Sequence, residues 1–551
     1  MAGLRDRKSV RLPPLITFVF KMKLPSFLPV SSSIALLVFS SSAFSRTVKG
    51  TPKSETLKGT AMQDTFYGYG GNDRIIGGEG ILSIGGTDKA YGGKGNDTYE
   101  IFGDPGKFGI IEKTASGNDS WIPTGRVGAR QVGQNTYKPS PWVVKTASGD
   151  QRAVLRLPAY VENLSSRVWN GAPNENEPTA NHVYTELHGN GAANILTGDD
   201  RATVADEWVS KAVSHDRIYG YGGDDTFRYG LGEDAYFGGD GWDTLDLRLA
   251  KVSALANAEP EFLVDLAAGT LVYGAIRNGT WAGSISKLDS IESVILSRGV
   301  DQVRGSANGD YLVIDQGDRA GGDRIWAGAG NDTLVIKRDF GGYQHIYYYG
   351  ETGFDLLDLS DFQVPVTIDL GSTARQPFPT TEGANVQGIE LMAVESVYSG
   401  PMSDTLSGNS ALTEVFRPGD GSDTIRGDNT PLADYTNVDY IYFDTPLNPV
   451  TNVDSVLDVK TEADNSRRLE DILYLDHHVF TTVVEGTPAG AAYLLAGRFK
   501  RIGSGGGTVD TDDRILADQD TGFIYYDADG SGPAEAVLFA KVTPGIAVAS
   551  V

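Results

Sequence analysis

The chain has 551 residues, a formal net charge of −25, 69 glycines and no cysteine. An acidic chain of this size repels phosphate, which argues against a nucleic-acid partner. The absence of cysteine excludes a disulfide framework and thiolate metal sites. The length permits several domains, yet most of it is taken up by glycine- and aspartate-rich repeats.

Residues 1–45 differ in composition from the rest of the chain. The segment from Ile34 to Phe39 is an apolar core too short to span a bilayer, with two lysines before it and small residues after it. This order resembles a secretory signal peptide with cleavage near Ala43 or Ser45. We therefore expect a destination outside the cytoplasm, secreted or at the cell surface.

A first aspartate-rich segment covers residues 46–105. Its candidate metal ligands are Asp64, Asp73, Asp88 and Asp97. The copy around Asp97 is complete, but Leu82 stands where an aspartate belongs, and a deletion precedes Asp88. Only Asp73 and Asp88 are expected to pair across a coil in this segment, at a distorted spacing.

The clearest repeat lies within residues 189–250. An aspartate recurs every nine residues, at Asp216, Asp225, Asp234 and Asp243. The copy from Gly238 to Asp246 fits Gly-Gly-x-Gly-x-Asp-x-U-x, where U is a large apolar residue. The glycines permit the positive φ that a tight turn needs. The last three positions predict a minimal strand whose apolar side chain, Ile218, Phe227, Tyr236 or Leu245, points inward. Six residues then turn and three residues pair.

This frame resembles the RTX (repeats-in-toxin) family, whose calcium-binding nonapeptides form a β-roll. The resemblance implies an all-β fold of right-handed parallel β-roll or β-solenoid segments, with two nonapeptides in each coil. Asp216 would then lie over Asp234, and Asp225 over Asp243. Carboxylates ~5 Å apart at an effective dielectric of ~20 repel by roughly 3 kcal/mol, so a cation is needed between them. Calcium suits such a site because it accepts six to eight oxygen ligands.

The resemblance predicts several calcium ions and a ligand set that extends into the turns. In the clearest roll the set is Asp216, Asp225, Asp234, Asp243, Gly220, Gly222, Gly238 and Asp240. The alternative is a glycine-rich turn array whose aspartates only cap turns. That alternative explains single aspartates but not their common frame. The excess of negative charge is either a supply of ligands or ordinary solubilising surface charge.

Two weaker copies follow. Residues 304–360 contain Asp310, Asp323, Asp332 and Asp355, with insertions that are expected to break the eighteen-residue pairing. Residues 401–428 contain Asp404 and Asp423, with Thr413 in the ligand position between them. We list Asp323, Asp332, Asp404 and Asp423 as candidate metal ligands.

Connecting segments over residues 106–188, 251–303 and 361–400 share a motif. It reads Val161 to Leu164 in the first, Ile291 to Val294 in the second and Val394 to Val397 in the third. Internal repeats in a fixed order indicate a solenoid of similar coils. We expect these segments to continue the β stack without metal.

Residues 429–551 resemble the end module found after RTX arrays in secreted bacterial calcium-binding proteins. Asp527, Asp529 and Ser531 alternate like the first ligands of an EF-hand loop. Leu538 replaces the glutamate at the twelfth position, and the flanks are predicted strands. The interpretation is a calcium loop between strands or a plain hairpin turn. The apolar end of the chain resembles a type I secretion tail.

No catalytic motif is found. The six histidines never form His-Glu-x-x-His, and no Gly-x-Ser-x-Gly elbow occurs. Tyr347, Tyr348, Tyr349 and Trp326 could stack on sugars, but alternate tyrosines suit core packing better. The adjacent His477 and His478 suggest a structural role rather than a metal site.

The sequence therefore predicts a secreted, non-enzymatic calcium-binding protein that folds when it meets extracellular calcium. The first alternative is an extracellular carbohydrate-active solenoid, such as a uronate epimerase or lyase, with its site between Ser120 and Val183. The second is a calcium-dependent adhesin or surface-layer component. Extracellular polysaccharide, the cell surface and a type I secretion apparatus are the corresponding partners besides calcium.

Overall fold

A computed structural model describes most of the chain after residue 45. The described residues are 46–60, 63–77, 88–102, 108–112, 117–126, 130–133, 136–138, 143–145, 151–159, 161–165, 167–169, 183–198, 216–230, 233–248, 261–277, 280–315, 322–337, 345–378, 388–409, 412–427, 438–457, 471–483, 494 and 496–544. Residues 44–551 form one compact unit, and the predicted signal peptide and the last residues of the predicted secretion tail lie outside the described residues. Within the described part, no helix is long and apolar enough to cross a membrane.

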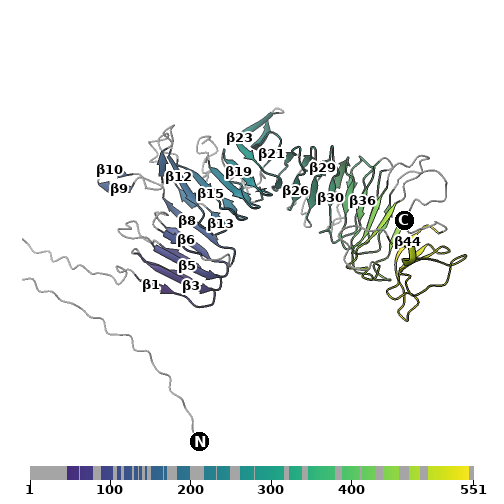
Figure 1. The fold of residues 1–551 in the computed structure, drawn as a ribbon. Helices are drawn as coiled ribbons and strands as arrows, with labels where there is room; N and C mark the ends of the chain where they lie inside the picture. The colour runs from purple at the N-terminus through teal and green to yellow at the C-terminus, as the bar shows by residue number, and fades with distance from the viewer. Residues whose placement is uncertain are drawn as a thin grey trace, which may run out of the picture. The chain divides into compact units, whose positions relative to one another are not determined.

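One parallel sheet, here called the continuous sheet, runs along the whole array (Figure 1). In spatial order its strands are β2 (Thr56–Lys58), β4 (Arg74–Gly77), β6 (Thr98–Phe102), β8 (Ser120–Arg126), β13 (Asn163–Ser165), β16 (Ile195–Thr197), β18 (Thr226–Arg228), β20 (Thr244–Asp246), β24 (Ser293–Ile295), β26 (Tyr311–Ile314), β28 (Thr333–Ile336), β30 (Leu356–Asp358), β34 (Ser396–Tyr398), β36 (Val415–Arg417), β38 (Tyr440–Phe443) and β40 (Ile472–Leu475). The short strand β14 (Arg167–Trp169) also pairs with β8.

The opposite side of the array consists of three separate sheets. The first is β1 (Thr47–Lys49), β3 (Thr65–Gly70), β5 (Asp88–Lys94) and β7 (Phe108–Ile110). The second is β11 (Val143–Lys145), β12 (Gln151–Arg156), β15 (Val183–His188), β17 (Arg217–Gly222), β19 (Ala235–Asp240), β23 (Thr280–Asp289), β22 (Thr270–Arg277), β21 (Phe262–Asp265), β25 (Gln302–Arg304), β27 (Arg324–Trp326), β29 (His345–Tyr349), β33 (Gly388–Met392) and β32 (Gln376–Pro377).

The third sheet joins the last coils to the C-terminal module. It contains β31 (Thr367–Asp369), β35 (Thr405–Ser407), β37 (Thr424–Arg426), β39 (Asp454–Leu457), β44 (Val537–Val542), β43 (Phe523–Tyr526), β42 (Ile515–Asp518) and β41 (Phe499–Ile502). The remaining elements are the hairpin of β9 (Arg130–Gly133) and β10 (Thr136–Lys138) and the 3-10 turn η2 (Ala496–Arg498). The described residues contain no α-helix, so the predicted all-β solenoid is confirmed.

Successive strands alternate between the two sides, which makes each coil of the solenoid. β17 pairs with β19 on one side, and β18 pairs with β20 on the other. The predicted inward side chains Ile218, Phe227, Tyr236 and Leu245 are all fully buried between the sheets. Tyr348 is also fully buried, whereas its neighbours Tyr347 and Tyr349 are half-buried on the outer side. The core is therefore one continuous column of inward apolar residues.

Strand lengths differ between the two sides. β18 and β20 have three residues each, as predicted, but β17 and β19 have six. The predicted uniform pattern of six turn residues and three paired residues is therefore wrong on that side, because the strand pairing continues into the glycine-rich positions. Tyr221 lies in this extension with a φ of 76°, a left-handed conformation that is rare for a bulky residue.

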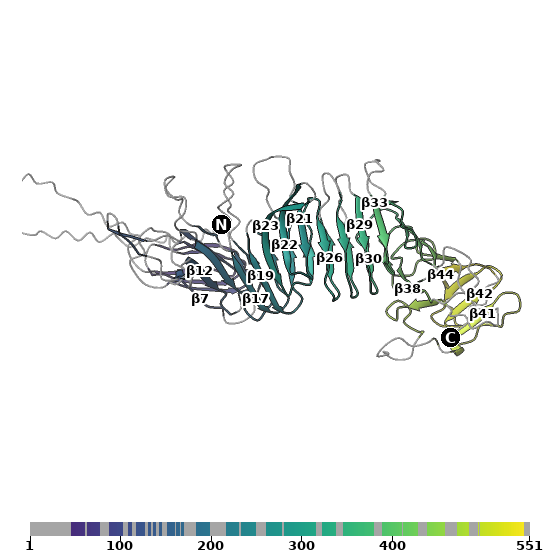
Figure 2. The same cartoon turned by 90° about the horizontal axis from the view of Figure 1, so that it is seen from above.

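The connecting segment between β20 and β24 departs from a simple coil. β22 and β23 form an antiparallel hairpin between the parallel strands β19 and β21 (Figure 2). The second of the three separate sheets therefore continues through this hairpin. Val264 on β21 and Leu271 on β22 are buried. The predicted continuation of the stack is therefore present, with an added hairpin.

The turns depend on glycines that leave no room for a side chain. A Cβ on Gly238 would overlap the Ser290 carbonyl and the Asp243 carboxylate, whereas a Cβ on Gly191 would meet nothing within 4 Å. We expect Gly238→Ala to lower the free energy of unfolding by roughly 1–3 kcal/mol, as overpacking does. Thermal unfolding at fixed calcium measures this, with Gly191→Ala as the matched control. Equal melting temperatures for the two variants would contradict the close packing of this turn.

Candidate functional site: two ladders of buried carboxylates

A row of buried carboxylates follows each edge of the array, where the chain enters a strand. Asp225 and Asp243 precede β18 and β20, and the Asp225 N–H donates to Asp243 Oδ1 at 2.9 Å. The Thr244 N–H in turn donates to the Asp225 carbonyl at 2.8 Å. Each carboxylate therefore accepts an N–H from the equivalent residue of the preceding coil. The strands that follow the two residues, here β18 and β20, pair in parallel.

The ladder that precedes the continuous sheet extends beyond the predicted repeats. Its side-chain acceptors are Asp73, Asp97, Asp119, Glu162, Asp225, Asp243, Glu292, Asp332, Asp355, Glu395, Asp439 and Asp471. The ladder on the other edge contains Asp64, Asp88, Asp216, Asp234, Asp301, Asp323, Asp404, Asp423 and Asp454.

The structure places Asp216 beside Asp234 and Asp225 beside Asp243, each pair eighteen residues apart. The predicted pairing of Asp73 with Asp88 is wrong. Asp73 pairs with Asp97, twenty-four residues along the chain. The residues that lengthen this coil fall between β4 and β5, so the strands on both sides keep their register and each ladder keeps its own edge.

Insertions in the later repeats also leave the stacking intact. The Asp310 N–H donates to Asp332 Oδ1 across twenty-two residues, and the Asp332 N–H to Asp355 Oδ1 across twenty-three. The eighteen-residue spacing is therefore lost, as expected, but the carboxylates still pair at the longer spacings. Extra residues lengthen a turn without changing which strands are neighbours, because strand pairing is set by the buried side chains.

Glu414, not Thr413, takes the ladder position before β36. Its N–H donates to Asp439 Oδ1 at 3.0 Å, and Phe416, two residues later, is the fully buried side chain of the strand. Asp404 and Asp423 are neighbours on the opposite edge, nineteen residues apart. A one-residue lengthening of the coil explains why counting by nines selects the wrong residue.

Glutamates of the connecting motif were not predicted as ladder members. Glu162, Glu292 and Glu395 each accept an N–H from the aspartate of the preceding coil, at 2.7 to 2.9 Å. Each stands two residues before a fully buried apolar side chain, as the aspartates do. The sequence contains this two-residue spacing, but aspartates and not glutamates were predicted as ligands at the position.

One oxygen of many ladder carboxylates is buried without a hydrogen-bond partner. Among the described residues this holds for Oδ2 of Asp73, Asp97, Asp119, Asp225, Asp243, Asp332 and Asp355. Buried polar atoms are normally satisfied, so such a repeated exception requires an explanation. A bound cation or protonation of the carboxylate would each remove the cost.

Burial raises the pKa of these carboxyl groups well above the ordinary value for aspartate. The pKa of Asp225 is raised to about 7 and that of Asp243 to about 6, chiefly by desolvation. Asp332 and Asp355 are raised to about 7 for the same reason, with carboxylate neighbours adding to the effect. Without a cation, burial therefore shifts these carboxyl groups toward the protonated acid.

A glycine shapes the space beside several of the unpartnered oxygens, among them those of Asp73, Asp97, Asp225, Asp243 and Asp355. A Cβ on Gly220 would overlap Asp225 Oδ2 and lie 2.7 Å from the Gly238 carbonyl oxygen of the next coil. A Cβ on Gly238 would similarly meet Asp243 Oδ2 and the Ser290 carbonyl. A carboxylate oxygen and a backbone carbonyl thus face one small space, and both are ligands that calcium prefers. The residues present fit the predicted ion.

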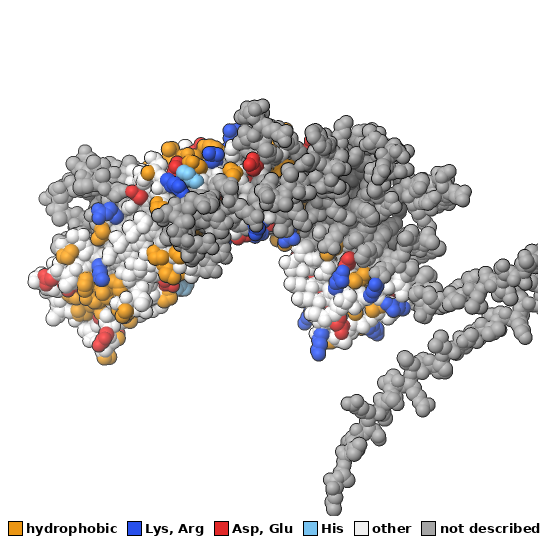
Figure 3. Space-filling view, turned by 180° about the vertical axis from the view of Figure 1, so that it is seen from behind, with side chains coloured by type: hydrophobic (Ala, Val, Ile, Leu, Met, Phe, Trp, Pro, Cys, Tyr) orange, Lys and Arg blue, Asp and Glu red, His pale blue; other side chains and the backbone are white. Residues whose placement is uncertain are grey.

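The other predicted turn ligands lie farther from these oxygens. Gly222 borders the backbone of Asp240, and the Asp240 side chain is exposed. The geometry therefore gives Asp240 no side-chain contact with a buried ladder oxygen. On the face drawn in Figure 3, acidic side chains form only small separate groups.

In the C-terminal module, Asp527 and Asp529 lie between β43 and β44. Asp527 Oδ1 accepts the Gly530 N–H at 2.8 Å, which is the pattern of a turn cap. Asp529 Oδ1 is buried without a hydrogen-bond partner among the described residues. Both the predicted calcium loop and the hairpin turn are compatible with this arrangement.

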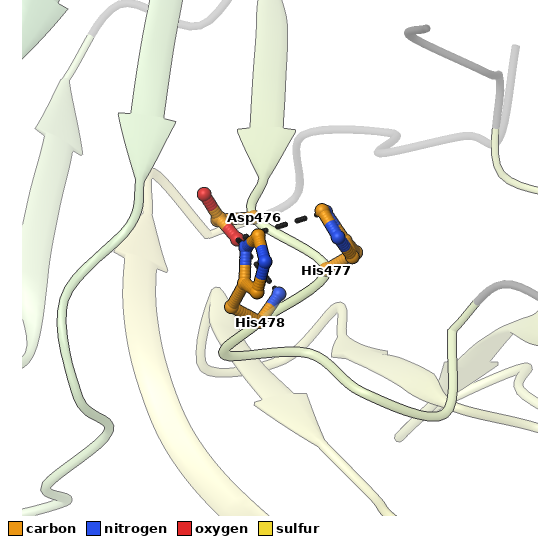
Figure 4. Close-up of side chains that lie close together, drawn as sticks. All are labelled: Asp476, His477 and His478. Atoms are coloured by element: carbon orange, nitrogen blue, oxygen red, sulfur yellow. Dashed lines mark hydrogen bonds and ion pairs between the residues drawn. The ribbon is translucent and has the colours of Figure 1, made fainter. Parts of the chain in front are cut away.

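Asp476, His477 and His478 form a separate exposed cluster after β40 (Figure 4). Asp476 Oδ1 accepts the His478 backbone N–H at 2.7 Å, and the His478 ring Nδ1 lies 2.9 Å away. The Asp476 carbonyl also accepts the Phe480 N–H at 2.8 Å. Asp476 therefore caps a turn, in agreement with the structural role expected for the histidine pair.

Comparison with known proteins identifies the repeats. A model of the RTX calcium-binding nonapeptide repeat matches four segments of the chain, residues 50–81, 85–99, 214–236 and 318–335. No curated protein matches the chain. The matched segments contain ladder aspartates from both edges, Asp73 and Asp225 on the edge of the continuous sheet and Asp216 on the other edge. The matched segments, the parallel solenoid and the paired carboxylates together show that this chain carries RTX calcium-binding repeats.

Proposed function

We propose that the protein is secreted, has no enzymatic activity and folds when its turns bind extracellular calcium. The observation that carries this proposal is the repeated burial of carboxylate oxygens without hydrogen-bond partners beside backbone carbonyls. Such oxygens destabilise the folded array while they are charged and unpaired. Calcium, when bound, would supply the missing positive charge and accept both kinds of oxygen.

The predicted ligands keep this role as proposals. They are Asp64, Asp73, Asp88, Asp97, Asp216, Asp225, Asp234, Asp240, Asp243, Asp323, Asp332, Asp404 and Asp423, the carbonyls of Gly220, Gly222 and Gly238, and Asp527 and Asp529 in the C-terminal loop. The ladder contacts add Asp119, Glu162, Asp355 and Asp439 to this set.

Mass action makes calcium a sufficient switch for folding. A site that sees free calcium at ~10 times its dissociation constant gains ~1.4 kcal/mol. Several such sites together supply an energy comparable to the whole stability of a domain. A low cytosolic calcium concentration would leave the array unfolded before export, and a high extracellular one would fold it.

A second candidate function is supported by the outer face of β15, β17 and β19. The rings of His188, Tyr219 and Phe237 stack at centroid distances of 5.0 and 4.7 Å. Tyr221 Oη lies 2.6 Å from His188 Nδ1, and His188 Nε2 lies 2.9 Å from Glu186 Oε1. A half-exposed tyrosine with a positive φ, bonded to an oriented histidine, is an arrangement that can transfer a proton. This observation favours the carbohydrate-active solenoid as the alternative.

Within the segment from Ser120 to Val183, where that enzyme site was expected, β8 and β13 continue the stack. We expect no unsaturated product when the wild-type protein is incubated with alginate or pectin. Product formation that Tyr221→Phe lowers by ~10²-fold, a typical size for acid–base catalysis, would establish the alternative instead. Tyr69→Phe is the matched control, because Tyr69 has a φ of 73° and similar exposure but Lys49 in the place of His188.

Calcium-dependent folding is tested by far-UV circular dichroism of residues 46–551 during a calcium titration, with magnesium as the control ion. We expect a cooperative gain of β signal that is specific for calcium. Asp225→Asn combined with Asp243→Asn should shift the midpoint to higher calcium, because the pair loses its charge. Asp289→Asn, at an exposed residue paired with Lys287, should leave the midpoint unchanged. A fully folded spectrum in chelator would reject the switch.

The pH dependence should differ in sign with and without calcium. Burial raises the pKa of Asp225 to about 7 and that of Asp332 to about 7, whereas an unfolded aspartate titrates near ~4. The calcium-free folded form therefore binds protons more tightly than the unfolded chain does, and its free energy of unfolding rises as the pH falls from about 7 to about 4. In chelator, the far-UV β signal at pH 5 should therefore exceed that at pH 8, because protonation shifts the calcium-free folding equilibrium toward the folded array.

In saturating calcium the opposite trend is expected, because calcium binds the deprotonated carboxylates and protons compete with it. The variant with Asp225→Asn and Asp243→Asn is the control, and its pH dependence in chelator should be weaker than that of the wild type. A calcium-free protein that is more folded at pH 8 than at pH 5 would contradict the raised pKa values of these buried carboxyl groups.

A further inference from the structure

A third carboxylate joins the ladder between β6 and β8. Asp97 precedes β6, Asp119 precedes β8, and Glu112 follows β7, and one oxygen of each lies within 4.8 Å of the others. Asp97 is 1% exposed and Asp119 is fully buried. Oδ2 of each has no hydrogen-bond partner among the described residues. Two buried, unsatisfied oxygens therefore share one small volume with a third acid.

The register of the strands explains how Glu112 reaches this place. Ala90 on β5 lies opposite Ile110 on β7, so Gly92, the first glycine of its repeat, lies opposite Glu112. In the clearest roll, the residue opposite the first glycine is Gly238, which offers only its backbone carbonyl. Here a side-chain carboxylate is added at the same position.

Hydrogen bonds fix the Glu112 side chain. Its Oε1 accepts the Gly92 N–H at 3.0 Å and also the hydroxyl of Tyr99, whose ring is fully buried in the core. The position of the third carboxylate is therefore set by the backbone and by a core side chain. Three acids held together in this way attract a cation more strongly than two, because each added negative charge contributes a further Coulombic attraction.

We infer that Asp97, Glu112 and Asp119 form a three-carboxylate cation site that binds calcium, and trivalent lanthanides, more tightly than the two-carboxylate turns do. The inference rests on the proposed calcium binding and adds an order of filling to it. This site binds calcium first as the calcium concentration rises. The strands next to it, β5, β6, β7 and β8, are then stabilised before calcium binds at the other turns.

Terbium tests the order of filling, because it takes oxygen ligands as calcium does and emits when a nearby tyrosine is excited. With one molar equivalent of terbium added to calcium-free protein, we expect emission that falls severalfold in Tyr99→Phe. Tyr236→Phe is the matched control. Tyr236 is also fully buried, and its hydroxyl lies 3.2 Å from Asp234 Oδ2 in the other roll. Its loss should leave the first-equivalent emission unchanged.

Calcium competition against a chromophoric chelator gives the affinity of the tightest site. Glu112→Gln should weaken that site by about tenfold or more, as loss of one close charge implies. Tyr99→Phe removes only the hydroxyl that orients Glu112 and keeps all three charges, so its tightest calcium affinity should fall less than that of Glu112→Gln. Circular dichroism in saturating calcium confirms that each variant is folded.

The inference is overturned if Tyr236→Phe lowers the first-equivalent emission as much as Tyr99→Phe does. It is also overturned if Glu112→Gln leaves the tightest affinity unchanged. Both results leave calcium binding by the array intact. A wild-type protein that binds neither calcium nor terbium would instead overturn the proposed function, and with it this inference.

Discussion

The array depends on one interaction, the hydrogen bond from a backbone N–H to the carboxylate of the following coil. It fixes an aspartate or glutamate at most turns, with Asn194 in that place before β16, and orients one oxygen along the stack, as between Asp225 and Asp243. Because strands lie ~4.8 Å apart, the next carboxylate is always near, and the second oxygen is left facing a glycine-lined space. The rest of the turn is shaped by the need to accommodate these two oxygens.

The same burial accounts for both stability and its dependence on solution conditions. A carboxylate that accepts an N–H contributes a charge-assisted hydrogen bond, but its desolvated second oxygen opposes folding. The raised pKa of Asp119, to about 7, records that opposition in the three-carboxylate region. A bound cation would offset this cost, so the cation concentration in the surrounding solution determines how much of the protein is folded.

Much of the fold could be predicted from the sequence, because a strict nine-residue frame specifies both the turn and the inward side chain. Ile218, Phe227, Tyr236 and Leu245 are buried as the frame requires. The pairing of Asp73 could not be predicted by counting, because inserted residues lengthen a turn without changing strand neighbours. Glu414 and Glu395 show the same limit, since the ladder selects an acid two residues before a buried side chain rather than an aspartate at a fixed interval. The position of Glu112 beside Asp97 and Asp119 is set by the register between β5 and β7, and no local sequence motif specifies that register.

The ladder also has a direction, because the acceptor always belongs to the later coil. Cutting the array between two coils would therefore create unlike ends. The amino-terminal piece would end in N–H donors that have lost their carboxylates, such as that of Asp225, and the carboxy-terminal piece would begin with the freed carboxylates. Both pieces would carry an open strand edge, a template for pairing with another chain, but only the carboxy-terminal piece would add free carboxylates to that edge. Cations in solution would therefore bind the two ends of a proteolysed array unequally.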